Sequence, residues 1–104
     1  MEDAEPMVTV HNVNVPGYTS RVNAAKYDVM RQVLLRVLPS QPPGKTQAEM
    51  FVAVKRSLRG PLFPGGSKSN WWAKTVQLDL EAKGIVRRSA DMKPLRWYRI
   101  KTPG

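Results

Sequence analysis

The stretch that decides the fold is Leu80-Glu-Ala-Lys-Gly84-Ile-Val-Arg-Arg88. Leu80, Val76 and Ala73 follow one another at steps of four and three residues, which places their side chains on one face of a helix. Gly84 can adopt the positive φ that ends a helix, and Ile85 can then enter the core as a strand begins. The stretch therefore predicts a packed helix that ends at Lys83, followed by an extended segment.

Upstream, residues 59–66 form a loop with two prolines and three glycines, and Ser67 or Ser69 can cap the helix that follows. Trp72 is expected in the core. Trp71 lies in a second apolar direction, shared by Thr75 and Leu78. We expect Trp71 to be buried under the valines near the N-terminus, and the alternative is a flat contact to a sugar, a base or a partner protein.

Two more helices precede that loop. The first starts at the N-cap Asn23 and ends before Pro39, with one apolar stripe made by Tyr27, Met30, Leu34, Val37 and Leu38. The second starts at a capping box, Thr46 with Glu49, because the hydroxyl and the carboxylate can each accept from a free backbone amide. It should run from Gln47 to about Leu58 and bury Ala48, Phe51, Val54 and Leu58.

The ends of the chain favour extended structure. Residues 85–88 and 95–101 are two candidate strands of an antiparallel ribbon. Residues 7–15 predict one strand, with a bend near His11 because its two valine pairs are out of phase. Residues 1–6 are acidic and end in proline, so we expect a tail there.

Three helices followed by a ribbon make a fold that is mainly α with a small antiparallel β-ribbon. This element order, together with the leucine, acid, glycine, apolar pair and arginine of residues 80–88, resembles the winged helix-turn-helix of MarR-type bacterial regulators. The whole chain is also similar to a small bacterial family of unknown function, through its run Phe63-Pro-Gly-Gly-Ser-Lys-Ser-Asn-Trp-Trp72. The resemblance implies a winged helix-turn-helix domain over residues 23–102; the N-terminal tail and extended segment over residues 1–22 have no counterpart in it.

The composition argues against an enzyme and against a metal or cofactor site. The chain has 104 residues, no cysteine and one histidine, His11, so thiolate sites and cysteine nucleophiles are excluded. Its carboxylates have helix or loop explanations; for example, Asp79 can pair with Lys83 at four residues. The glycine-rich loop does not fit a nucleotide-binding loop, because Gly66 stands where that motif requires lysine.

The charge favours an anionic partner. Lysine and arginine number 17 against 8 acidic residues, a formal charge of +9. A field of this sign attracts polyanions such as nucleic acid, although many basic surfaces are simply solvated. No apolar run is long enough for a membrane span and the N-terminus lacks the basic start of a signal peptide, so we expect a cytoplasmic protein with no membrane partner.

Charge and resemblance together predict a protein that binds double-stranded DNA, with no small-molecule ligand. Free backbone amides at the start of the third helix suit a phosphate, beside Lys68 and Ser69. Lys74 and Thr75 are the expected major-groove contacts, and Asn70 suits an adenine edge unless it is only a helix cap. The ribbon adds a basic wing for phosphates or a minor groove, with Arg87, Arg88, Lys93 and Arg96 as its contacts.

Two other functions compete with this one. A winged-helix scaffold could instead hold a protein partner on the surface of Trp71 and Leu78, and RNA binding ranks after that. A single recognition helix commonly needs a second copy for useful affinity, which makes a homodimer possible.

Overall fold

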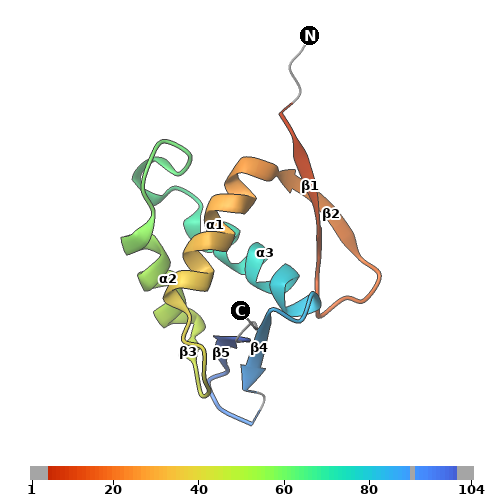
Figure 1. The fold of residues 1–104 in the computed structure, drawn as a ribbon, viewed down its shortest axis with the longest axis vertical. Coiled ribbons are helices and arrows are strands. Elements are labelled where there is room, and N and C mark those ends of the chain that lie inside the picture. Colours follow the sequence, from red (N-terminus) through yellow and green to blue (C-terminus); the bar gives the residue numbers. More distant parts are fainter. Residues whose placement is uncertain (1–4, 90, 101–104) are drawn as a thin grey trace.

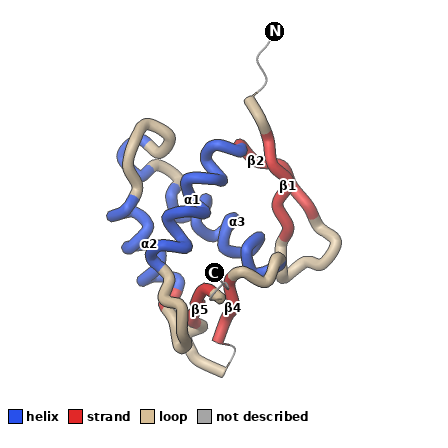
Figure 2. The backbone as a smooth tube through the Cα atoms, in the orientation of Figure 1, coloured by secondary structure: helices blue, strands red, loops and turns tan. Residues whose placement is uncertain are grey.

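The computed structural model describes residues 5–89 and 91–100. The described residues form three α-helices, one short 3-10 turn and two antiparallel sheets (Figures 1 and 2). The elements are β1 (Met7–His11), β2 (Thr19–Asn23), α1 (Ala24–Val37), β3 (Lys45–Thr46), α2 (Gln47–Ser57), a 3-10 turn (Pro64–Gly66), α3 (Ser69–Ala82), β4 (Val86–Ser89) and β5 (Arg96–Arg99). The fold is thus a mixed α/β globule with three helices.

The helices form the centre of the molecule and the sheets lie at its periphery. In Figure 1, α1 crosses in front of α3, α2 lies on the left, and the β1–β2 hairpin lies on the right. The second sheet has the strand order β3-β5-β4 and closes the lower end. Both sheets are antiparallel throughout. α3 therefore contacts the other two helices, the β1–β2 hairpin and the β3-β5-β4 sheet.

The core is formed where the apolar faces of the three helices meet. On α3, Ala73, Val76 and Leu80 are completely buried and Trp72 is buried, which confirms the predicted inner face. On α2 the prediction is partly wrong: Ala48 is exposed, whereas Met50 is completely buried. Val54 and Leu58 are buried as predicted and Phe51 is half-buried; Met50, four residues before Val54, takes the inward position at the start of the helix.

Local signals place most helix ends correctly. The Asn23 side chain accepts from the Lys26 amide at 2.9 Å, and both bonds of the Thr46–Glu49 capping box are present. Gly84 has a φ of 76°, and the Ile85 amide reaches back to the Leu80 carbonyl at 2.9 Å. These contacts form the helix-ending motif that the glycine predicts.

The start of α3 differs from the expectation. Lys68 precedes the helix with a left-handed φ of 58°, and no side chain caps the helix there. Ser69 is already the first helical residue and is buried, so neither it nor Ser67 acts as the cap.

The N-terminal segment is a hairpin instead of one bent strand. β1 ends at His11, two successive turns follow, and β2 returns so that Val8 pairs with Val22. Asn12 stabilises the turn because its side chain accepts from the Asn14 amide at 2.9 Å. β2 was missed because it contains one apolar residue, Val22, which joins the core. The domain boundary expected after residue 22 therefore falls inside a strand.

The C-terminal ribbon forms as predicted and gains a third strand. β4 pairs with β5, and the two-residue β3 adds to the other edge of β5. Trp97 is buried and Tyr98 is half-buried, which decides the inward aromatic that alternation left open. β5 is shorter than the expected strand 95–101, because it begins at Arg96 and ends at Arg99; residue 101 lies outside the described residues.

Truncation of Leu80 tests this core. Because Leu80 is completely buried at the centre of α3, Leu80→Ala should lower the free energy of unfolding by about 2 to 5 kcal/mol, measured by urea denaturation. Leu78→Ala is the matched control on the same helix, where the side chain is half-buried, and it should cost less. Equal losses in the two variants would contradict the assigned inner face.

Candidate nucleic-acid interface

One side of α3 remains open to solvent along its N-terminal half. Asn70, Trp71 and Lys74 are exposed there, and Thr75 is half-buried. Lys68 is exposed just before the helix. The structure therefore brings together on one helix most of the residues that the sequence assigned to base or phosphate contacts.

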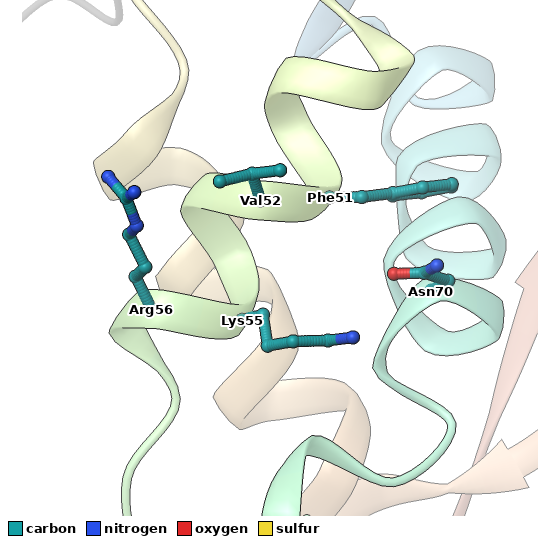
Figure 3. A pocket seen from close by; sticks show the side chains of 5 residues that line it. All are labelled: Phe51, Val52, Lys55, Arg56 and Asn70. Carbon is teal, nitrogen blue, oxygen red and sulfur yellow. The ribbon is translucent and has the colours of Figure 1, made fainter.

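A groove separates this part of α3 from α2. Phe51, Val52, Lys55 and Arg56 line it from α2, and Asn70 lines it from α3, around a volume of 340 Å³. Figure 3 shows Phe51 and Lys55 reaching from α2 toward the helix that carries Asn70. The amide of Asn70 thus faces Lys55 and Phe51, whereas Arg56 extends from the other side of α2 (Figure 3).

Sequence analysis missed Lys55 and Arg56 as site residues. Gly66 explains how the lysine is placed: a Cβ at residue 66 would lie 3.2 Å from Cγ of Lys55, so the glycine leaves room for the stem of the lysine. The sequence signal that could have indicated them is the pair of adjacent cations on the predicted second helix, close to Val52. In the structure, Val52 is 54% exposed. The position of Lys55 opposite Asn70 depends on the packing of α2 against α3.

Ser69 does not share the solvent-facing position of its neighbours. Its side chain is buried, and its hydroxyl has no hydrogen-bond partner among the described residues. Burial removes this hydroxyl from any contact with a ligand at the surface. The start of α3 thus presents Lys68 and Asn70 to solvent without the serine between them.

The wing cations fall into two groups. Arg87 and Lys93 are exposed. Arg96 instead donates to the Gly44 carbonyl at 3.0 Å and lies 3.4 Å from a carboxylate oxygen of Glu49. Together with Arg88, it serves contacts within the protein, so half of the four predicted wing contacts are already occupied.

Arg88 belongs to a network centred on the carboxylate of Glu81. Its Nε and Nη2 donate to Glu81 at 2.7 and 3.2 Å, and its guanidinium lies 5.7 Å from the centre of the Trp97 ring. The same carboxylate accepts from Nε1 of Trp97 at 2.9 Å and from Nε2 of Gln77 at 3.0 Å. Only 4% of the Glu81 side chain is exposed. The network therefore joins α3 to β4 and β5 and sets the position of the wing.

A second buried carboxylate, Asp79, joins α3 to the other side of the molecule. It accepts from the Tyr27 hydroxyl, from Nζ of Lys83 at 2.8 Å and from the His11 backbone amide at 2.9 Å. The predicted pair of Asp79 with Lys83 is thus confirmed. Burial, together with the bond to Asp79, raises the pKa of Tyr27. For Lys83, burial lowers the pKa, but the bonds to Asp79 and Tyr27 outweigh it and the net pKa is raised.

The described residues offer no alternative centre for metal chemistry. Across residues 5–89 and 91–100, no three histidine or acidic side chains gather closely enough to hold a metal ion. In the same part of the chain, no helix combines the length and apolar character needed to cross a membrane.

The chain belongs to the family of unknown function DUF6958, whose model matches residues 7–97. The resemblance to a family of unknown function is thereby confirmed, and the matched range includes the β1–β2 hairpin. No curated protein and no solved structure matches the chain.

The Glu81 network makes a prediction about Arg88 that differs from the behaviour of a free surface charge. Arg88→Glu should lower the free energy of unfolding by about 2 kcal/mol or more, because it places a second carboxylate against a buried one. Arg87→Glu is the matched control on the neighbouring exposed residue and should change stability little. Urea denaturation of both variants checks this, and equal stability of the two would exclude a structural role for Arg88.

The Asp79 cluster predicts loss of stability at alkaline pH. Because the folded protein holds the protons of Tyr27 and Lys83 more tightly than the unfolded chain, their contribution is complete below their ordinary pKa values of 10.0 and 10.5. The contribution is then lost as the pH rises through the raised values. Urea denaturation at increasing pH should show this decline in the wild type and a weaker one in Tyr27→Phe. Tyr18→Phe, at an exposed tyrosine, should keep the wild-type dependence, and a decline identical in all three proteins would contradict the assignment.

Proposed function

We propose that this chain is a winged helix-turn-helix domain that binds double-stranded DNA, with α3 as the recognition helix, and that it acts in the cytoplasm as a small regulator. The order of elements supports the fold. From α1 onward it is helix, short strand, helix, helix and two strands, and the short strand β3 joins the sheet through β5. The helix end at Gly84, which prompted the likeness to MarR-type regulators, has the expected backbone.

The observation that carries the function is the groove between α2 and α3. It places Lys55 on the side of α2 that faces Asn70, which belongs to the first turn of the proposed recognition helix, while Arg56 lies at the outer edge (Figure 3). Phosphate oxygens are bound by lysine and arginine, whereas an asparagine amide can pair with an adenine edge. The groove thus combines the two kinds of contact that recognition of a duplex requires.

The remaining proposed DNA contacts are assigned to cations of α3 and the wing that are exposed to solvent. Lys74 lies one turn beyond Asn70 on the same open side of α3 and is proposed to enter the major groove with Thr75. Arg87 and Lys93 of the wing are proposed to bind phosphates. Arg88 and Arg96 act indirectly in this proposal, because their bonds to Glu81 and Gly44 hold the wing in position.

The proposal includes neither catalysis nor a cofactor. It includes a homodimer as the species that binds a full DNA site, because one domain of this kind reads only one half-site in the major groove. Two copies would present two α3 helices to successive turns of the duplex.

Binding to a fluorescent duplex across a salt series tests the proposal. If five cations each neutralise one phosphate, the slope of log affinity against log salt should be about −4.5. The five cations are Lys55, Lys68, Lys74, Arg87 and Lys93. Because these charges lie on the surface, Lys74→Glu should weaken binding while leaving the melting temperature nearly unchanged.

Arg36→Glu provides the control, since it makes the same change of charge at an exposed residue of α1, a helix that the proposed contact does not use. Its effect on affinity should be smaller than that of Lys74→Glu. Equal effects of the two variants would show that the net charge alone attracts DNA. Absence of duplex binding at low salt would reject the proposed function altogether.

A further inference from the structure

A second groove lies around α3 from the first, where the helix meets the β1–β2 hairpin. Val10 and Val22 from the hairpin are buried at its base, while Tyr18 and Trp71 line it and remain 53% and 56% exposed. Its volume is 180 Å³. The expectation that the N-terminal valines bury Trp71 is therefore wrong: Val10 and Val22 are buried, but the indole stays open beside them.

The aromatic walls of this groove are held in place by contacts behind them. The Trp71 ring meets the ring of the buried Trp72 edge-on, with 5.2 Å between centroids and an interplanar angle of 83°. Trp72 is packed in the same way against Phe63 at 6.0 Å. Trp71 can thus offer a flat surface whose orientation is already set, which lowers the entropy cost of stacking a ligand on it.

Polar groups stand around the apolar base. His11, Asn12, Ser20 and Thr75 also line the groove, so hydrogen-bond donors and acceptors accompany the aromatic walls. The hairpin itself is tied down at two points, because the His11 amide donates to Asp79 and Nη2 of Arg88 donates to Asn14 at 3.2 Å. The groove is therefore a built feature between two restrained elements.

We propose that this groove holds one unpaired nucleobase of the nucleic acid bound along α3, an inference that rests on the proposed function. A base has apolar faces that stack on an aromatic ring and polar edges that hydrogen-bond, which matches the walls and the rim of the groove. Trp71 follows Asn70 in the first turn of α3, and its side chain leaves the helix about 60° from that of Lys74, so a strand held by Asn70 and Lys74 can pass the mouth of the groove. The positive charge of the chain attracts the phosphates that flank such a base.

A second copy of the chain fits the groove less well. A narrow recess with a polar rim does not complement itself, so the proposed homodimer is expected to form through another face. The inference therefore concerns preference among nucleic acids: the protein binds best where a duplex carries an unstacked base.

Three fluorescent probes test the inference: a fully paired duplex, the same duplex with one unpaired base, and that second duplex with the unpaired base replaced by an abasic site. Stacking on an aromatic side chain corresponds to about 5- to 150-fold in affinity, so the wild type should prefer the unpaired base over the abasic site within that range. Trp71→Ala and Tyr18→Ala should lose this preference and keep the affinity for the fully paired duplex. Both side chains are more than half exposed, and unchanged melting temperatures verify that the variants fold.

The other outcomes separate this inference from the proposed function. Lys74→Glu should weaken binding to all three probes and keep the preference. Equal wild-type affinity for the unpaired base and the abasic site overturns the groove inference while DNA binding stands. No binding to any probe overturns both. If Trp71→Ala changes the molar mass in solution, by light scattering, without changing the preference, the groove is an interface between copies and the inference fails.

Discussion

The position of the wing depends on the buried carboxylate of Glu81. Four donor contacts from Gln77, Arg88 and Trp97 converge on its two oxygens. A carboxylate that is almost completely withdrawn from water is tolerated only when it is paired and hydrogen-bonded in this way. The arginine and the tryptophan come from two different strands, so the same requirement that satisfies the charge also holds β4 and β5 against α3.

Asp79 makes a complementary connection from the same helix. Residues two positions apart on a helix point about 200° away from one another, so Asp79 and Glu81 leave α3 in nearly opposite directions. Asp79 contacts Tyr27 of α1 and the backbone of β1, whereas Glu81 contacts the wing. One helical turn therefore positions the hairpin on one side and the ribbon on the other. The exposed half of α3 lies between restrained neighbours, which is the arrangement that a preformed binding surface needs.

This arrangement changes the interpretation of the basic residues. The sequence suggests that every arginine of the wing can contact a ligand. In the structure, however, Arg88 binds Glu81 and Arg96 binds the Gly44 carbonyl. Lys55, a cation of α2 that no wing pattern suggested, extends instead toward α3 (Figure 3). The positive surface proposed to meet DNA is consequently formed by α2 and α3 together with the free wing residues. Its attraction for DNA depends on how close these cations lie to one another in the fold, because many other arrangements of the same residues would give a similar net charge.

The sequence by itself determined the features whose cause lies within a few residues. Asn23, the Thr46–Glu49 box and Gly84 mark helix ends because each satisfies backbone groups of its own turn. The spacing of Ala73, Val76 and Leu80 likewise defines a helix face without reference to any partner. Only the tertiary structure decided what Glu81 and Arg88 do, that β2 and β3 pair with distant strands, that Trp71 stays open, and that Lys55 lies beside Asn70. Each of these results from contacts between segments far apart in the chain, and local periodicity carries no information about which distant surface a side chain will meet.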